Sequence, residues 1–224
     1  MQALPFYIYL TFGFTAIASI WAIYKAANSS KVFLLLISLW VILQSILGLT
    51  GFYRVTTLPP RFVFLLLPPL LFLLIGLAVP GGRRFIDGLN IKILTLFSLM
   101  RIPVEIVLFW LFLHKAIPEA MTFEGRNFDI LSGLSAPFIW YFGFAKGRMN
   151  KTLLMIWNIV CLGLILNVVT IAVLFVTGRS APSGVDPSGI AMVYFPFLLL
   201  PSCLVPLVLL SHVSAIRQLL KKTP

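Results

Sequence analysis

The stretch NIKILTLFSLMRIPVEIVLFWLFLHK, residues 90–115, decides the class of fold. Between Lys92 and His114 its charged residues are Arg101 and Glu105, and most of the others are apolar. A helix that crosses the hydrocarbon core of a bilayer needs about 20 apolar residues. Residues 93–113 therefore predict a membrane-spanning helix with two charged side chains near its middle.

The composition of the whole chain supports a membrane protein. The 224 residues are 60% hydrophobic and 10% charged, with a mean hydropathy of +1.06, whereas soluble domains average about 25% charged residues. The net charge is +11, but its lysines and arginines gather in short segments between apolar stretches. Such loops set topology and meet anionic headgroups, so the charge does not indicate nucleic-acid binding.

Seven segments are long and apolar enough to predict spans. Backbone polar groups in lipid must bond internally, and barrel-like alternation is absent, so the spans are expected to be helices. The sequence therefore predicts an all-α integral membrane protein with a single seven-helix transmembrane domain over residues 1–224. The expected spans are 4–24, 32–53, 62–79, 93–113, 130–145, 152–176 and 190–210.

Basic residues predict the orientation of these spans. The first, third and fifth loops and the C-terminal tail hold eleven Lys and Arg, against five in the second, fourth and sixth loops. Basic loops stay in the cytoplasm. The N-terminus is therefore expected outside and the C-terminus inside, most simply in the cytoplasmic membrane.

Two spans suggest an internal repeat. FLLLPPLLFLLIGL (64–77) and FLLLPSCLVPLVLL (197–210) match at eight of fourteen positions, although leucine-rich spans often look alike. A repeat would give a 3+1+3 arrangement, which resembles the architecture of seven-helix sugar transporters and microbial rhodopsins. The seventh expected span has no lysine, so it cannot hold a retinal Schiff base.

Arg101 and Glu105 are the first candidates for a functional site. Residues four apart lie on one face of a helix, and a charge at mid-bilayer is expensive unless it is paired or faces a cavity. The two side chains are thus expected to pair inside the protein. They are either a structural clamp or the floor of a ligand-binding or proton-coupling site.

A second group of candidates occupies the fourth loop, which is expected outside. MTFEGRNFD (121–129) holds Glu124, Arg126, Asn127 and Asp129, and His114 and Glu119 precede it. Asn127 or Asp129 could cap the next helix. Alternatively, the loop lines an outward-facing mouth, with Gly125 supplying a turn that aims Glu124 and Arg126 inward.

Five polar or aromatic residues within the spans are secondary candidates for lining a pore. They are Gln44, Trp140, Tyr141, Asn158 and Asn167. Interhelical hydrogen bonding and packing are the simpler interpretation. No zinc or haem motif appears, and His114 and His212 are expected on opposite sides of the membrane, so neither a metal site nor a catalytic residue is assigned.

These patterns favour a small-solute carrier or binding protein, with a polar site beside Arg101 and Glu105. An integral-membrane enzyme with an outward-facing acidic loop is an alternative, and a sensor or accessory subunit is another. The expected partners are the lipid bilayer and a small solute, without nucleic acid. Neither a cofactor nor the oligomeric state is indicated.

Overall fold

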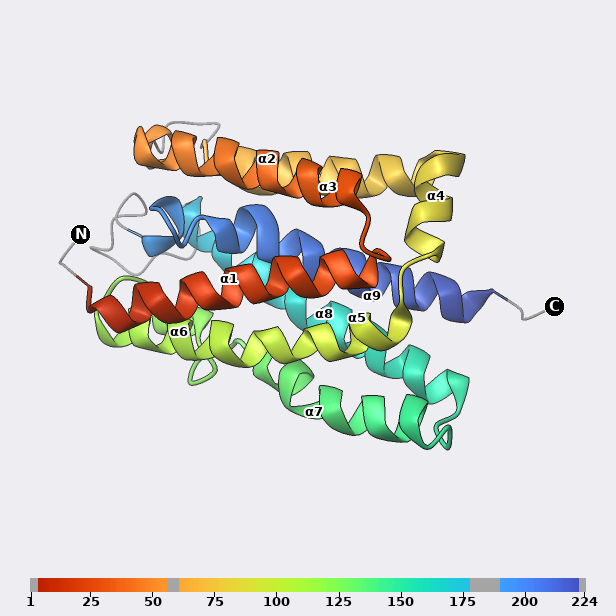
Figure 1. Ribbon diagram of the computed structural model, residues 1–224. Helices are drawn as coiled ribbons and strands as arrows, with labels where there is room; N and C mark the ends of the chain where they lie inside the picture. The colour runs from red at the N-terminus through yellow and green to blue at the C-terminus, as the bar shows by residue number, and fades with distance from the viewer. Residues whose placement is uncertain (1–3, 56–60, 178–189, 222–224) are drawn as a thin grey trace.

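The computed structural model describes residues 4–55, 61–177 and 190–221, and over these residues the chain is helical and without strands. The long helices lie along one common axis (Figure 1). The first described residues lie at one end of this bundle and the last described residues at the other. We call these the N-terminal end and the C-terminal end of the bundle.

Five helical segments are long and apolar enough to cross a membrane. They are α1 (Phe6–Ala26), α2 (Lys31–Leu49), α5 to α6 (Ile91–Leu113), α8 (Lys151–Val176) and η7 to α9 (Leu200–Leu220). A sixth is added if α3 (Val63–Ala78) and α4 (Pro80–Asp87), which are bent by 98°, are counted as one span. The chain is thus a multi-pass helical membrane protein with five to six apolar spans among its described residues.

The fifth expected span, 130–145, is shorter than a bilayer requires. It consists of α7 (Ile130–Trp140) and a π-helical turn, η4 (Tyr141–Ala145). At 1.5 Å per residue, such a helix is about 24 Å long, whereas the hydrocarbon core is about 30 Å thick. Figure 1 shows α7 starting about halfway along the bundle rather than at its N-terminal end. Seven complete crossings therefore remain a prediction.

The last span differs from its predicted bounds. It begins at Leu200 rather than at 190, with the π-helical turn η7 (Leu200–Leu204) followed by α9 (Val205–Leu220). Residues 190–199 form instead a buried, mostly irregular segment that includes the short helix η6 (Ala191–Val193). His212 consequently lies in the middle of a span and not in a tail beyond it. The span still contains no lysine.

Local sequence explains several of the helix ends. Ser30 and Asn90 cap α2 and α5 (Ile91–Phe97) with their side-chain oxygens, which accept from free backbone N–H groups. The bend between α3 and α4 depends on glycine, because a Cβ on Gly82 would lie 2.3 Å from the carbonyl oxygen of Gly76. The polar helix α4 turns across the C-terminal end of the bundle (Figure 1).

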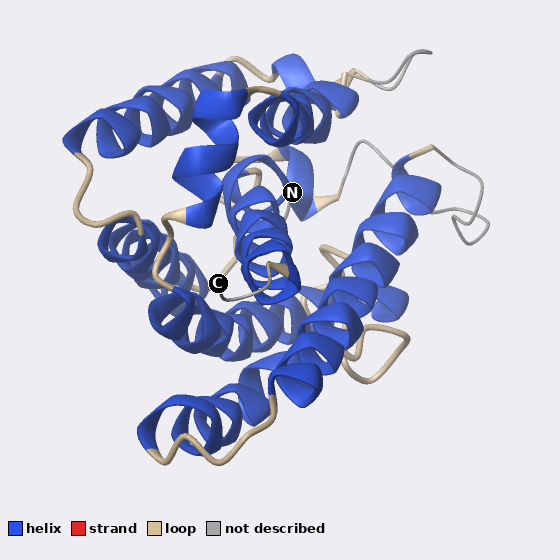
Figure 2. Ribbon diagram, turned by 90° about the vertical axis from the view of Figure 1, so that its right-hand side faces the viewer, coloured by secondary structure: helices blue, strands red, loops and turns tan. Residues whose placement is uncertain are grey.

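Helix α9 occupies the centre of the bundle. In the end-on view it is surrounded by the other helices (Figure 2), and it packs against α3, α4, α5 and α8.

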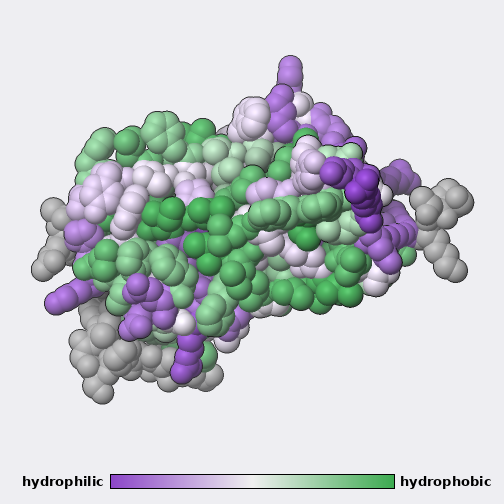
Figure 3. Space-filling view, turned by 90° about the horizontal axis from the view of Figure 1, so that it is seen from below, coloured by the Kyte–Doolittle hydropathy of each residue, from purple (hydrophilic) through white to green (hydrophobic). Residues whose placement is uncertain are grey.

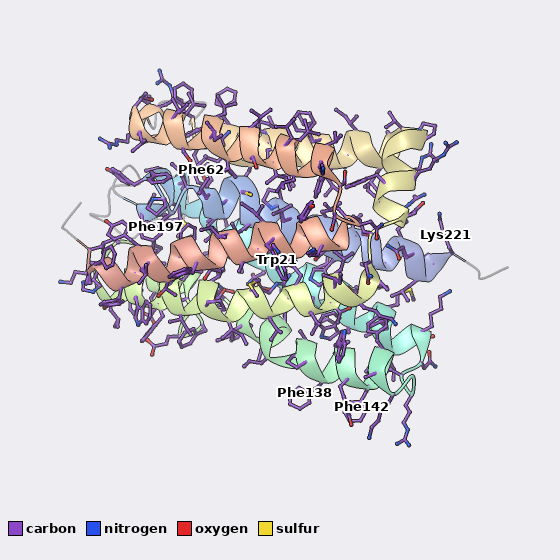
Figure 4. All side chains as sticks on the ribbon, viewed as in Figure 1. Trp21, Phe62, Phe138, Phe142, Phe197 and Lys221 are labelled. Carbon is purple, nitrogen blue, oxygen red and sulfur yellow. The ribbon has the colours of Figure 1, made fainter. Side chains whose placement is uncertain are left out.

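Hydrophobic residues cover most of the middle of the face drawn in Figure 3, and hydrophilic ones gather towards its ends. Phe138 and Phe142 point outward from the bundle (Figure 4). This distribution is the one a bilayer imposes.

Candidate functional site

The segment between α6 and α7, residues 114–129, enters the interior of the bundle without forming a long helix. It holds the short helix η3 (Glu119–Met121), and beyond it Thr122, Asn127 and Asp129 are buried. Turns within the segment satisfy several of its backbone groups, and the carbonyl of Ala116 accepts from the amide of Ala191, which lies in a distant part of the chain. Non-helical backbone at membrane depth is tolerated only inside protein or beside a water-filled cavity.

Arg101 and Asp129 form the central ion pair. Arg101 Nη1 donates to Asp129 Oδ1 at 2.6 Å, and the two side chains are 3% and 4% exposed. Arg101 is the first residue of α6 (Arg101–Leu113), and Asp129 immediately precedes α7. The ion pair therefore joins the middle of one span to the buried start of another helix.

His212 and Asn158 extend this pair to α8 and α9. Arg101 Nη2 lies 2.8 Å from His212 Nε2, and His212 Nδ1 lies 2.9 Å from Asn158 Oδ1. A guanidinium can only donate, so Nε2 accepts and the imidazole is neutral, with its proton on Nδ1. The hydrogen bonds thus run in one direction, from Arg101 through His212 to Asn158, and Asn158 donates onward to the carbonyl of Leu154.

Glu105 occupies a neighbouring position with a different partner. Its Oε1 accepts from Asn127 Nδ2 at 2.7 Å, and Asn127 also donates to the carbonyl of Met121. Glu105 is only 2% exposed, and its Oε2 has no hydrogen-bond partner among the described residues. The Nε of Arg101 also lacks one.

We call this set the Arg101 cluster. Four elements meet in it: α6, the buried segment before α7, α8 and α9. Its members are Arg101, Glu105, Asn127, Asp129, Asn158 and His212.

The structure changes the expected pairing of Arg101. The salt bridge is made with Asp129, and none joins Arg101 to Glu105. Asp129 does occupy the residue before α7, but its side chain makes no capping hydrogen bond there. It faces Arg101 instead, while Asn127 Oδ1 accepts from the backbone N–H of Asp129. A charged partner outweighs a cap at this buried position, because a lone guanidinium in the interior is costly.

Close helix packing holds the cluster together. A Cβ on Gly133 of α7 would lie 2.8 Å from Ile102 Cγ1 and 3.2 Å from the carbonyl oxygen of Ser98. Trp157 packs edge-on against the imidazole of His212, with ring centroids 5.9 Å apart, and donates to Ser135 of α7. The cluster is thus a closed, tightly packed interior rather than an open channel.

The other outer-loop candidates lie apart from the cluster. Glu119, Glu124 and Arg126 are exposed and His114 is half-buried, at the N-terminal end of the bundle. Gly125 does not aim Glu124 or Arg126 inward. Its role is a close approach, since a Cβ there would lie 2.3 Å from the carbonyl oxygen of Glu119.

Of the five secondary candidates, Asn158 alone belongs to the cluster. Gln44 is buried and accepts from Tyr53. Asn167 is exposed and donates to the carbonyl of Arg126, which ties the buried segment to α8. Trp140 is half-buried and Tyr141 exposed on the outer helix pair α7 and η4.

His212 was absent from the candidates predicted by sequence. The sequence SHVSAIRQ (211–218) could have revealed it. These small and polar residues follow an apolar run, but none of them ends a helix, so His212 could have been placed inside the last span. The described residues contain no group of three His, Cys, Asp or Glu side chains placed to hold a metal ion.

A second charged group lies at the C-terminal end of the bundle. Asp87 of α4 accepts from Arg217 Nε at 2.6 Å and pairs with Lys221 at 2.5 Å. Its hydrogen bond with Arg217 holds the pKa of Asp87 below its usual value, with a smaller contribution from Lys221. This pairing fastens α4 to the end of α9.

Comparison with known proteins does not place the chain in a family: no protein-family model matches it, and neither does a curated protein or a solved structure. Function has to be inferred from the Arg101 cluster itself.

Proposed function

We propose that the protein is a proton-coupled carrier of a small polar solute, with the Arg101 cluster as its site and Glu105 as its proton-binding group. The observation that carries the proposal is the charge balance of the cluster. Arg101 is paired with Asp129, so an ionised Glu105 would add a buried negative charge without its own cation.

Protonation of Glu105 removes this uncompensated charge. The closed cluster is then neutral overall, which the low-dielectric interior favours. Loss of the proton would favour states in which water reaches the carboxylate. Such a difference in stability between closed and open states is what couples a proton to a conformational change.

The helices around the cluster support a carrier. Transporters place substrate sites near the bilayer midplane, at helices that are interrupted there. Here α7 begins near the middle of the bundle, a 3₁₀ turn, η2 (Ser98–Met100), directly precedes Arg101, and a π-helical turn precedes α9. The free Arg101 Nε gives the site a donor for a polar or anionic solute group.

The orientation is part of the proposal. Lys31, Arg84 and Lys151 lie at the C-terminal end of the bundle with most of the other described basic residues. This end is proposed to face the cytoplasm, and the N-terminal end, towards which the segment before α7 lies, to face outward. The cytoplasmic membrane is the corresponding location.

The test uses protein reconstituted into vesicles on a solid-supported membrane. Currents are recorded as a panel of small organic acids, amino acids and sugars is applied with and without a pH gradient. We expect Glu105→Gln to lose the current that depends on the pH gradient, while the exchange of labelled solute, measured in the same vesicles, is kept. Glu124→Gln, which changes an exposed carboxylate of the same segment, is the matched control and should behave as wild type.

An infrared measurement tests Glu105 without any solute. The carbonyl stretch of a protonated carboxylic acid should be present in the closed protein and missing in Glu105→Gln. If the band is absent from the wild type, Glu105 is ionised and the proposal fails. Product formation from a panel compound without a gradient would favour the enzyme, and copurification with a larger complex the accessory subunit.

A further inference from the structure

A long apolar groove lies on the opposite side of α9 from the Arg101 cluster. It runs between the hairpin of α2 and α3 and the central helix α9, with α4 closing one end, and has a volume of about 490 Å³. Phe33 and Trp40 of α2, Phe72 of α3, Phe85 of α4 and Leu207 of α9 are among the residues that line it. We call it the α2–α3 groove.

The polar groups of the groove are already bonded within the protein. The Trp40 indole donates to the carbonyl of Ser202 at 2.8 Å, and the Ser202 hydroxyl donates to the carbonyl of Leu198. The groove therefore offers an occupant apolar surface and little else. An alkyl chain satisfies this surface, whereas a polar solute would lose its hydrogen bonds to water there.

The length of the groove matches one leaflet. Its lining on α2 extends from Phe33 to Leu43, about 15 Å at 1.5 Å per residue. The hydrocarbon core is about 30 Å thick, so each leaflet contributes about half of that. Helix α2 begins towards the C-terminal end of the bundle (Figure 1), and the residues that line the groove, Phe33 to Leu43, belong to the first two-thirds of this helix.

Positive charge surrounds the end of the groove that α4 closes. The Phe33 and Phe85 rings meet there with centroids 4.9 Å apart, and Lys31 and Arg84 lie within two residues of them and are exposed. Among the described residues, Asp87 is the carboxylate of this end, and it is bonded to Arg217 and Lys221. Lys31 and Arg84 are thus left to bind an anion.

We infer that the α2–α3 groove binds one anionic phospholipid. One acyl chain lies along α9 between α2 and α3, and the phosphate-bearing headgroup lies at Lys31 and Arg84. Basic pockets between membrane helices on the cytoplasmic side bind such headgroups. This site is independent of the Arg101 cluster and of the proposed transport.

Brominated lipids test the inference, because bromine in an acyl chain quenches a tryptophan that it touches. A variant that keeps Trp40 and has Phe at the other four tryptophans is placed in vesicles of phosphatidylcholine with increasing brominated phosphatidylglycerol. Quenching should saturate at a low fraction of the anionic lipid. A matched variant that keeps only Trp21, which is 61% exposed on α1, reports on bulk lipid. Its quenching should follow the lipid composition without a headgroup preference.

Charge variants then test the headgroup. Each basic residue near a membrane surface contributes about fivefold to the binding of an anionic lipid. Lys31→Gln with Arg84→Gln should remove most of the preference for phosphatidylglycerol at Trp40. Lys115→Gln with Arg126→Gln, at the other end of the bundle, should leave it unchanged. Equal quenching of Trp40 by the brominated forms of both lipids would overturn the inference.

Native mass spectrometry tests lipid binding on the wild-type protein, where no substitution can affect the result. Protein released from mixed phosphatidylglycerol and phosphatidylcholine should retain one phosphatidylglycerol at collision energies that remove phosphatidylcholine. Retention of neither lipid, or of both alike, would show that the groove is not a specific lipid site. Retention of a fatty acid alone would equally contradict the assignment to a phospholipid.

Discussion

Neutralising Asp129 should destabilise the protein far more than its small change in shape suggests. Asp129→Asn keeps the volume of the side chain but leaves Arg101, 3% exposed, without its anion. Removing one partner of a buried ion pair costs about 3–5 kcal/mol. Arg101→Met should cost a similar amount, because it leaves both Asp129 and the ring nitrogen of His212 without their donor.

The double variant Arg101→Met with Asp129→Asn should be less damaging than the sum of these two. It contains no unpaired charge, so its cost is mainly the unsatisfied His212 nitrogen, about 1–3 kcal/mol. The expected coupling energy between Arg101 and Asp129 is therefore at least about 3 kcal/mol, as for other close buried charge pairs.

Reversible unfolding in mixed detergent micelles measures each free energy. The matched cycle pairs Arg101→Met with Glu105→Gln, which are not joined by a salt bridge, and its coupling should be below about 1 kcal/mol. Two outcomes refute the reasoning: additive losses for Arg101 and Asp129, or a coupling that is larger with Glu105 than with Asp129.

Three further predictions concern packing, pH and orientation. Gly133→Ala should destabilise by about 1–3 kcal/mol, because its methyl group would meet Ile102, whereas Gly163→Ala, with open space around it, should not; thermal unfolding of both variants decides. Asp87→Asn should lose about 1 kcal/mol at pH 7. Arg217 lowers the folded-state pKa of Asp87. The contribution of Asp87 to stability is therefore complete above its unfolded-state pKa of about 3.9, and it is lost as the pH falls through the folded-state pKa. The unfolding free energies of wild type and Asp87→Asn, measured at pH 7 and in acid, should differ at pH 7 and converge in acid. Alkaline phosphatase fused to the C-terminus should be inactive and a fluorescent protein there bright; an active phosphatase would reverse the proposed orientation.

Sequence reasoning succeeded where solvent alone decides the outcome. Apolar runs of about 20 residues can be satisfied in lipid only as helices, and this predicted α1, α2, α8 and the span from α5 to α6. It also marked Arg101 and Glu105 as interior, since neither charge can face lipid. Both are buried.

Sequence reasoning failed where long-range packing decides. The four-residue spacing suggested Glu105 as the partner of Arg101, but Asp129, 28 residues away, reaches it. Residues 190–199 are as apolar as a helix, yet they pack at the N-terminal end of the bundle, where Phe197 contacts the ring of Phe12. Hydropathy shows that a segment is apolar, but it cannot distinguish an irregular segment buried in the protein from a helix that spans the membrane. Because the last span was predicted to end at residue 210, His212 was expected outside it, and its hydrogen bonds with Arg101 and Asn158 were not anticipated.

Arg101 also imposes an order on biogenesis. It leaves the ribosome 28 residues before Asp129 and 111 residues before His212. Until Asp129 has been synthesised, the counter-ion of Arg101 does not yet exist. An unpaired arginine at the centre of a helix opposes insertion into the membrane by about 2.5–3.5 kcal/mol. The short helix α7 is a weak insertion signal by itself. Neither α6, with its unpaired arginine, nor the short α7 inserts readily alone. We therefore expect α6 to remain at the translocon until Asp129 has been synthesised, so that α6 and α7 enter the bilayer together.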